Sequence, residues 1–328
     1  MTPLLEVEDL RISLPSRAGD VRIVDGVSFE VRPGQVFGLA GESGCGKTMT
    51  ALSLLRLLPA SARTSGHALF HGRDLLTASH AELRRLRGRK LAMVFQDPTS
   101  SLHPMLTIER QMTEHLRVHL RMDRKQADRR ALALLEEVRI PDPAAALRGY
   151  PHQFSGGMRQ RIQIAMALAC EPELLIADEP TTALDVTVQA GILGLIERLC
   201  RANGLAVILI THDLGVLSAL SDTVTVMYAG RVVETGPTAQ VVQQPRHPYT
   251  RGLLDSLPHP DRADQPLVPI AGMPPGPAER PSGCAFHTRC AFARDSCRRD
   301  VPALIELGAA RAMACPVDPL LAVPELVG

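Results

Sequence analysis

A glycine-rich octapeptide near the start of the sequence has the residue types and spacing of a phosphate-binding loop. Its residues are Gly41, Glu42, Ser43, Gly44, Cys45, Gly46, Lys47 and Thr48. The segment fits G-x-x-x-x-G-K-[ST], follows an apolar stretch over 36–40 and opens a helical pattern over 48–58, the context expected of a P-loop. We expect backbone N–H groups of the loop to face a phosphate, Lys47 to reach the terminal phosphates of a nucleotide, and Thr48 to ligate Mg²⁺. A glycine-rich turn that matches by chance is the alternative.

Two carboxylates stand at the end of an apolar stretch further along the chain. Residues 174–177 read Leu-Leu-Ile-Ala and are followed directly by Asp178 and Glu179. Two acids at the end of a buried strand are costly unless they bind something. We expect Asp178 to hold Mg²⁺, directly or through water, and Glu179 to polarise an attacking water. A solvated strand end with ordinary acids is the alternative, and the P-loop upstream argues against it.

Between these segments, Ser155, Gly156 and Gly157 precede a helical pattern that runs to Cys170. A serine and two glycines can present a hydroxyl and backbone N–H groups to a phosphate at the start of a helix. Alone, Ser-Gly-Gly is more often a flexible turn. The longer stretch 154–160 resembles the signature motif of ABC ATPases, usually written LSGGQ, and its place just before the acidic strand makes the resemblance specific.

Three further residues resemble ABC motifs and occur in the expected order. Gln96, after an apolar strand over 91–95, resembles the Q-loop glutamine, and Asp185 resembles the D-loop aspartate. His212, after an apolar strand over 206–211, resembles the switch histidine.

The resemblance assigns roles to these residues. It implies an ATPase in which Glu179, His212 and Gln96 are catalytic. The P-loop residues and Asp178 would bind ATP with Mg²⁺, and Gln96 would be a further Mg²⁺ ligand beside Thr48 and Asp178.

The resemblance also implies that the chain works in a pair. ABC ATPase domains associate head to tail and hold two ATP molecules between them, so Ser155, Gly156 and Gly157 would contact a nucleotide bound by the partner. Asp185 would be a further nucleotide-binding residue. The family usually stacks adenine on an aromatic residue of the first strand region. This sequence has Leu14 at that place, and leucine offers no ring on which a base can stack.

Three longer stretches resemble the oligopeptide and dipeptide (peptide/nickel) importers: 95–104, 181–189 and 247–254. The resemblance implies an ATP-hydrolysing subunit that powers uptake of di- and oligopeptides, with nickel or glutathione as alternative solutes. Its partners would be a second ABC ATPase subunit, two membrane permease subunits and an extracytoplasmic solute-binding protein. The expected location is the cytoplasmic face of the cell membrane.

A soluble, non-transport ABC ATPase is the alternative from another class. The chain has one P-loop and no internal repeat, whereas factors that act on ribosomes normally carry two ATPase domains. Its formal net charge of +1 gives no broad basic face for nucleic acid. No apolar run approaches the roughly 20 residues that span a bilayer, and no signal peptide is visible.

The elements that position these residues form an α/β pattern. Apolar strand candidates over 36–40, 91–95, 174–177 and 206–211 alternate with helical patterns, as in a core with parallel strands. We therefore expect a P-loop ABC ATPase core with a helical subdomain and a small Cys-containing C-terminal module. The expected domains are a nucleotide-binding domain over 1–257, with a helical insert about 97–170, and a Pro-rich linker with the C-terminal module over 258–328.

Four of the seven cysteines lie in the tail, at Cys284, Cys290, Cys297 and Cys315. In a reducing compartment such a cluster favours a metal over disulfides, although C-x2-C pairs are missing. The resemblance implies a [4Fe–4S] cluster on these residues, with zinc as an alternative. Four reduced thiols that bind no metal are the remaining alternative. We expect a structural role, because the tail is far in sequence from every ATP motif.

Overall fold

The computed structural model describes residues 2–17, 19–97, 101–181, 186–257, 268–308 and 310–317. The chain divides into two compact units. The first contains residues 1–31, 37–76 and 211–328, and the second contains residues 32–36 and 77–210. Among the described residues, no helix combines the length and the apolar character needed to cross a lipid bilayer.

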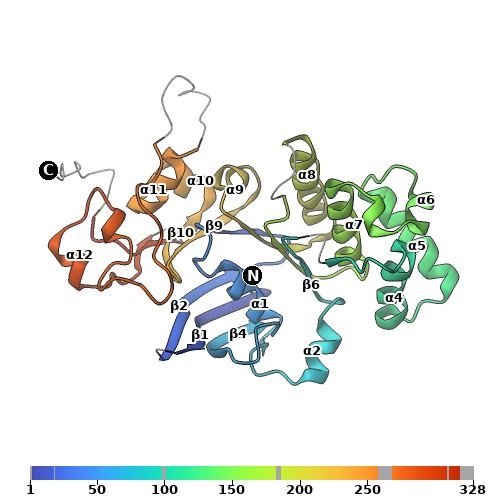
Figure 1. Cartoon of the computed structure of the whole chain (residues 1–328), viewed down its shortest axis with the longest axis horizontal. Coiled ribbons are helices and arrows are strands. Elements are labelled where there is room, and N and C mark those ends of the chain that lie inside the picture. The colour runs from blue at the N-terminus through green and yellow to red at the C-terminus, as the bar shows by residue number, and fades with distance from the viewer. Residues whose placement is uncertain are drawn as a thin grey trace. The chain divides into compact units, whose positions relative to one another are not determined.

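The first unit contains an antiparallel sheet in the order β2-β1-β4-β5, drawn in blue in Figure 1. Its strands are β1 (Leu5–Ser16), β2 (Gly19–Val31), β4 (Arg63–Phe70) and β5 (Arg73–Asp74). Along β1, the apolar residues Leu5, Val7, Leu10 and Ile12 are buried. The alternation shifts by one residue at the irregularity around Asp9 (φ 45°), so the buried residues on both sides of it can face the core.

A second set of strands in this unit has the order β11-β12-β10-β9-β3. The strands are β3 (Val36–Ala40), β9 (Thr223–Tyr228), β10 (Arg231–Pro237), β11 (Ile305–Gly308) and β12 (Arg311–Met313). β3 is buried along its whole length and pairs in parallel with β9. β12, which belongs to the C-terminal tail, pairs antiparallel with β10. The tail is therefore joined to the core by main-chain hydrogen bonds.

Short helices complete the first unit (Figure 1). They are α1 (Lys47–Leu54), α9 (Leu214–Leu220), α10 (Thr238–Gln243), α11 (Pro248–Asp255), the 3₁₀ turn η3 (His287–Arg289) and α12 (Asp295–Arg299).

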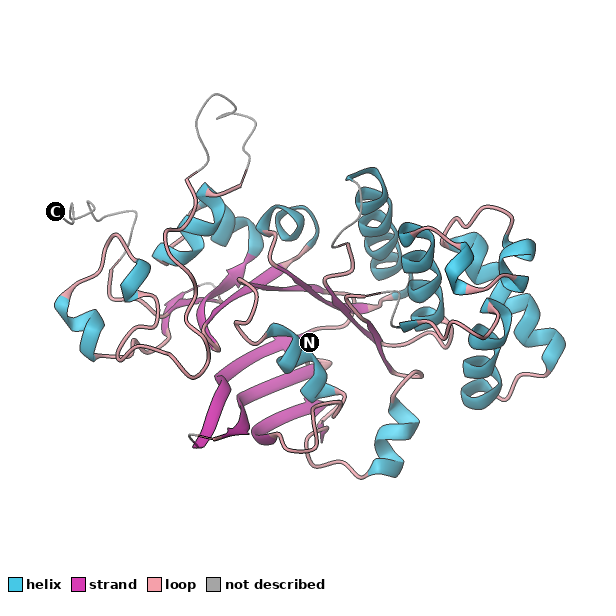
Figure 2. Ribbon diagram, in the orientation of Figure 1, coloured by secondary structure: helices cyan, strands magenta, loops and turns pink. Residues whose placement is uncertain are grey.

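The second unit contains three parallel strands in the order β8-β7-β6, accompanied by most of the longer helices, which are cyan in Figure 2. The strands are β6 (Leu91–Val94), β7 (Leu174–Asp178) and β8 (Ala206–Thr211). The helices are α2 (His80–Leu86), α4 (Ile108–Leu120), α5 (Arg124–Glu137), α6 (Pro143–Arg148), the 3₁₀ turn η1 (Pro151–Gln153), α7 (Gly156–Leu168) and α8 (Val186–Asn203). β7 and β8 are buried throughout, which explains their continuous apolar sequences.

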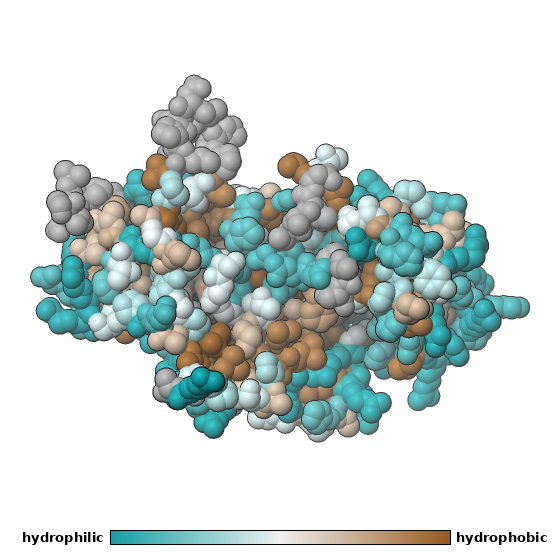
Figure 3. Space-filling model, viewed as in Figure 1, coloured by the Kyte–Doolittle hydropathy of each residue, from teal (hydrophilic) through white to brown (hydrophobic). Residues whose placement is uncertain are grey.

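Helices α4, α5, α6 and α7 pack on one another within the second unit. Within the helical insert expected about 97–170, α4 and α5 are separate helices. The break occurs where Arg121 adopts a left-handed conformation (φ 54°) and Asp123 forms a capping box with Gln126. On the face seen in Figure 3, these helices carry mainly hydrophilic residues, as expected of amphipathic helices with one buried stripe.

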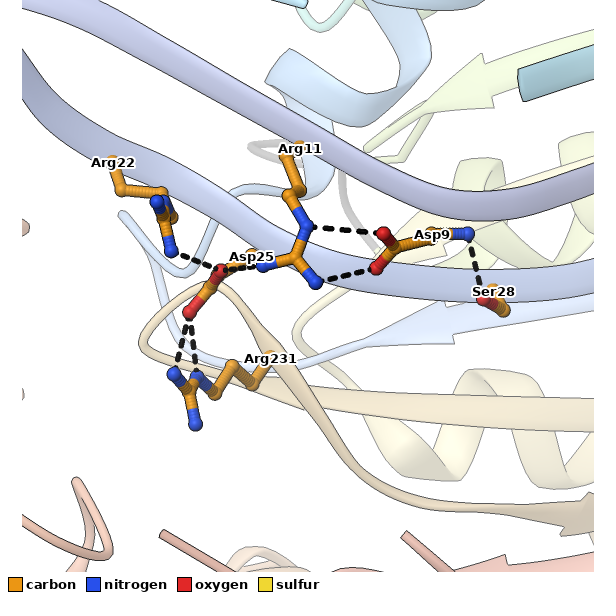
Figure 4. A network of polar contacts seen from close by, with 6 residues as sticks. All are labelled: Asp9, Arg11, Arg22, Asp25, Ser28 and Arg231. Carbon is orange, nitrogen blue, oxygen red and sulfur yellow. Dashed lines mark hydrogen bonds and ion pairs between the residues drawn. The ribbon is translucent and has the colours of Figure 1, made fainter. Parts of the chain in front are cut away.

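A buried carboxylate joins the first and second strands to β10 in the first unit. Figure 4 shows Asp25 of β2 between three arginines. Its Oδ1 accepts hydrogen bonds from Arg11 (2.8 Å) and Arg22 (2.9 Å), and its Oδ2 accepts one from Nε of Arg231 (2.8 Å). The Asp25 side chain is 3% exposed. Burial alone would raise the pKa of Asp25, but the hydrogen bonds and positive charges of Arg231 and Arg22 outweigh it and lower the pKa.

The loop that follows β3 packs directly on another strand. Gly41 has φ 144°, and a Cβ atom there would lie 2.3 Å from the carbonyl oxygen of Met227 in β9. Gly44, three residues on, has φ 81° but no heavy atom within 4 Å of such a Cβ. Glycine is therefore required at position 41 by the close contact and by the backbone conformation, and at position 44 by the backbone conformation alone.

We predict that Asp25→Asn lowers the free energy of unfolding by about 2 kcal/mol at pH 7, because charge-assisted hydrogen bonds to the arginines are lost. Folding lowers the pKa of Asp25. Its contribution to the free energy of unfolding is therefore complete above the unfolded-state pKa of about 3.9 and is lost as the pH falls through the folded-state pKa. Urea unfolding at pH 7 and at successively lower pH measures the difference. Asp20→Asn, at the exposed Asp20–Arg63 pair, should cost less than about 0.5 kcal/mol. Equal costs for the two variants would contradict the prediction.

We predict that Gly41→Ala lowers the free energy of unfolding by about 3 kcal/mol or more, since its Cβ meets backbone that cannot move aside. Gly44→Ala is the matched control. It keeps the strain of a left-handed backbone but meets no atom, so it should cost about 1 kcal/mol. Urea unfolding of both variants without nucleotide checks the pair, and similar losses in both would show that the Met227 contact does not limit the loop.

Candidate functional site

The predicted phosphate-binding loop lies between β3 and α1 in the first unit. Gly46 caps α1 in a left-handed conformation (φ 107°), and Lys47 is the first residue of the helix. The Lys47 side chain is buried, and its Nζ donates to the carbonyl oxygens of Gly41 (2.6 Å) and Glu42 (3.1 Å). Thr48 follows and is exposed. The loop therefore curls around the lysine with the N-terminal N–H groups of α1 at its mouth, an arrangement suited to an anion.

Two residues that the P-loop pattern does not include hold this loop. The hydroxyl of Tyr249 in α11 accepts a hydrogen bond from the backbone N–H of Glu42 (2.8 Å). Arg289 of the tail makes an ion pair with the Glu42 carboxylate (2.7 Å). Burial raises the pKa of Tyr249 well above its usual range, and the hydrogen bond to Glu42 raises the pKa of Arg289. The tail, although far in sequence from every ATP motif, is thus in contact with one of them.

The predicted acidic strand end is formed in the second unit. Asp178 closes β7 and Glu179 follows it; their exposed fractions are 2% and 9%. Glu179 has φ 45°, and its N–H donates to the carbonyl oxygen of Ile210 in β8 (2.9 Å). Its Oε2 accepts a hydrogen bond from Nε2 of Gln96 (3.1 Å). The structure therefore brings Gln96 and Glu179 together, although 83 positions separate them.

The Ser-Gly-Gly segment forms the start of α7 in the same unit. Ser155 is exposed and is the N-cap, where its hydroxyl accepts from the N–H of Met158 (3.3 Å). Gly156 is the first helical residue. A Cβ on Gly157 would lie 2.8 Å from Cγ1 of Val188 in α8. A larger residue at 157 would push α7 and α8 apart, so glycine is required by packing here.

The remaining predicted residues have simpler surroundings. His212 is exposed and follows β8, in the first unit with the P-loop. Its neighbour Asp213 caps α9 by accepting from the N–H groups of Gly215 and Val216. Leu14 is half-buried in β1. Asp185 lies outside the described residues.

Candidate ligands for Mg²⁺ are found in both units. Asp178 and Gln96 belong to the second unit, and Thr48 to the first. Their carboxylate, amide and hydroxyl oxygens are the hard donors that Mg²⁺ takes in proteins, and Mg²⁺ also binds substrate phosphates. The donor chemistry therefore fits magnesium.

The tail cysteines do not form a ready metal site. All four are among the described residues, yet no group of three or more His, Cys, Asp or Glu side chains there is arranged to hold a metal ion. The thiols are free, and Cys297 and Cys315 are buried. Burial, with a smaller contribution from the charges of neighbouring tail thiolates, raises the pKa of Cys290 to about 11 and that of Cys315 to about 12. The raised pKa values favour the protonated form of Cys290 and Cys315.

Two family profiles match consecutive parts of the chain. Residues 24–182 match the family described as ABC transporter. Residues 233–297 match the family described as the C-terminal region of oligopeptide and dipeptide transporters. The first match contains the P-loop, the signature and the acidic strand end, and the second contains α11 and three of the four tail cysteines.

Several named relatives align over nearly the whole chain. A probable peptide ABC transporter ATP-binding protein of Sinorhizobium fredii is 50% identical over 95% of this chain and 94% of its own length. A dipeptide transport ATP-binding protein of Bacillus subtilis is 49% identical over 92% of this chain and 91% of its own. An oligopeptide transport ATP-binding protein of Salmonella typhimurium is 45% identical over 97% of this chain and 95% of its own length.

Solved structures show the same fold. A dimeric bacterial ABC transporter cassette superposes with a TM-score of 0.64 and 25% identity, covering 71% of this chain and 98% of that one. The same figures hold for a dimeric post-hydrolysis state of an ATP-binding cassette bound to ADP and phosphate. Together with the relatives, these matches show that this chain belongs to the family of ABC transporter ATP-binding subunits, in its oligopeptide and dipeptide importer group.

Proposed function

We propose that this chain hydrolyses ATP to power the uptake of di- and oligopeptides through a membrane ABC importer. The observation that carries the proposal is that one chain contains both an ABC ATPase region and the C-terminal region of oligopeptide and dipeptide transporters. Relatives named as peptide, dipeptide and oligopeptide transport subunits support peptides over nickel or glutathione. A soluble, non-transport ABC ATPase gains no support from these names.

The proposed chemistry divides the work among three groups of residues. The P-loop binds the phosphates of ATP, with Lys47 turning from the carbonyls of Gly41 and Glu42 toward the β- and γ-phosphates. Thr48, Asp178 and Gln96 hold Mg²⁺, which neutralises charge on the phosphate oxygens when it is bound.

Glu179 orients and polarises the attacking water, and the hydrogen bond from Gln96 supports this role because it fixes the orientation of the carboxylate. His212 is proposed to contact the γ-phosphate. Its exposed position directly after β8, in the same unit as the P-loop, supports this role.

The chain is proposed to act as one of a pair. Ser155, Gly156 and Gly157 would then contact a nucleotide held by a second ABC ATPase subunit, and Asp185 would be a further nucleotide-binding residue. The exposed Ser155 at the start of a thirteen-residue helix supports this role. Two permease subunits and a solute-binding protein would complete the importer. The chain would lie at the cytoplasmic face of the membrane, held there by the permeases.

Two domains are proposed for this work. Residues 1–257, with the helical insert about 97–170, would form the nucleotide-binding domain, and 258–328 would form the linker and the C-terminal module.

We also propose that the four tail thiols hold a [4Fe–4S] cluster, with zinc as the alternative. Four thiolates supply the donors for either, and Cys315 lies near enough to the other three for their charges to raise its pKa. Because they are not arranged around a metal, loading would have to move them.

The proposed function is tested by isolating the transporter. A tagged chain is purified from detergent-solubilised membranes, co-purifying permeases are identified, and the complex is reconstituted in vesicles with its binding protein. ATP turnover should rise with di- or oligopeptides. Stimulation by nickel or glutathione alone would replace the solute, and recovery without any membrane protein would favour a non-transport ATPase.

We predict that Glu179→Gln keeps ATP binding but lowers steady-state hydrolysis by about two to four orders of magnitude, the usual range for losing a general base. The reason is that the water loses its carboxylate while Lys47 and the Mg²⁺ ligands remain. Phosphate release by the assembled transporter measures the rate. Glu171→Gln, the same change at an exposed glutamate paired with Arg130, should leave the rate unchanged. Near-normal turnover in Glu179→Gln would remove Glu179 from the mechanism.

We predict that anaerobically purified protein contains iron and is brown, and that Cys290→Ser removes both. Cys170→Ser, a buried cysteine outside the tail, should keep them. Metal analysis of the wild-type protein and both variants decides the identity of the group. Stoichiometric zinc without iron would establish the alternative metal, and absence of both would leave four reduced thiols.

A further inference from the structure

The Glu42 carboxylate lies inside the loop that is proposed to bind the phosphates of ATP, and a tail arginine neutralises it. Arg289 donates from both terminal nitrogens, Nη1 to Oε2 (2.7 Å) and Nη2 to Oε1 (3.0 Å). The Arg289 side chain is only 4% exposed and that of Glu42 is 25% exposed. A two-bond, charge-assisted pair of this kind is strong and has a fixed geometry.

Arg289 is itself held on several sides. Its Nε donates to the carbonyl oxygen of Ala271 (2.9 Å), and its guanidinium lies near the rings of Tyr228 (5.9 Å) and Phe286 (6.0 Å). These contacts fix the position of the guanidinium independently of its ion pair with Glu42. The arginine therefore acts as a rigid support and does not follow the loop.

Glu42 is also held through its main chain. Its N–H donates to Tyr249, which is fully buried and packs on Tyr228 (4.6 Å between ring centres) and Phe286 (5.3 Å). Its carbonyl oxygen accepts from Lys47. The N–H, the carboxylate and the carbonyl of this one residue are thus engaged by α11, by the tail and by the P-loop lysine.

A single buried carboxylate links α11 to the tail. Glu234 of β10 is fully buried; one oxygen accepts from Arg311 of β12 (2.7 Å) and the other from the N–H of His247 (3.0 Å), the N-cap of α11. The two elements that hold Glu42 therefore share an anchor in the core. Displacing either one would expose this anchor, which is costly for a buried charge.

We propose that Arg289 is a positioning residue for ATP binding, which acts by neutralising and orienting Glu42 in the phosphate-binding loop. This proposal rests on the proposed function, since it assumes that the loop binds ATP. An unpaired carboxylate in the loop would repel the phosphates and leave the loop free to turn. The C-terminal tail is on this account a part of the nucleotide site.

The test is a cycle of substitutions at Arg289 and Glu42. Arg289→Met should weaken ATP affinity about tenfold, because the Glu42 carboxylate is left unpaired. Adding Glu42→Gln should restore the affinity to within about threefold of wild type, since the repelling charge is then absent. Arg289→Lys should lie between, because it keeps the charge but not the two-bond geometry. Affinity is measured by titration calorimetry in the hydrolysis-deficient Glu179→Gln background.

Controls separate this role from a structural one. Arg299→Met removes an exposed arginine of the same tail and should change nothing. If Arg289→Met does not fold, Tyr249→Phe removes only the hydroxyl that accepts from Glu42 and should weaken ATP binding about threefold.

Three results would overturn the proposal. They are an unchanged affinity in folded Arg289→Met, a loss that Glu42→Gln does not relieve, and, where Tyr249→Phe stands in, an unchanged affinity in that variant. A parent chain that binds no ATP would overturn the proposed function as well, whereas normal binding by parent and variants would overturn only the role of Arg289.

Discussion

The phosphate-binding loop keeps its curve because strand backbone surrounds it. Gly41 is packed against the carbonyl of Met227, and the N–H of Gly230 donates to the carbonyl oxygen of Cys45 (2.9 Å). A Cβ on Gly46 would lie 3.3 Å from the carbonyl oxygen of Ile23. A P-loop must leave its own N–H groups free for a phosphate, so its shape has to come from neighbouring segments. β2, β9 and the turn into β10 supply that shape, and the ion pairs of Asp25 join β2 to the turn.

The chemistry of the site could be predicted because its signals are local. The glycines, Lys47 and Thr48 are consecutive, and the stretch before them forms the strand expected over 36–40. Strands expected over 174–177 and 206–211 were confirmed with at most one residue added. Buried parallel strands have continuous apolar sequences, so their ends, where Asp178 and His212 stand, are visible without a structure.

The support of the loop could not be predicted because its signals are distant. Tyr249 is 207 positions from Glu42 and Arg289 is 247 positions away. Contacts between residues so far apart in the sequence cannot be predicted from local sequence patterns. No motif includes Arg289, and the prolines before the tail predict a linker that leads to a small C-terminal module. Pairing of β12 with β10 and the buried Arg311–Glu234 ion pair attach it instead.

The contact between the C-terminal tail and the phosphate-binding loop couples the stability of the tail to ligand binding at the loop. The tail has a small core, in which Phe292 packs on a buried cluster of Met313, Cys315 and Val317, so much of its order comes from contacts with β10 and Glu42. A ligand that stabilises the phosphate-binding loop would therefore also stabilise the contacts between the loop and the tail. By thermodynamic linkage, a change that weakens those contacts would weaken binding of the ligand. Such linkage needs no movement of the whole chain, because Arg289 and Tyr249 already contact the same residue.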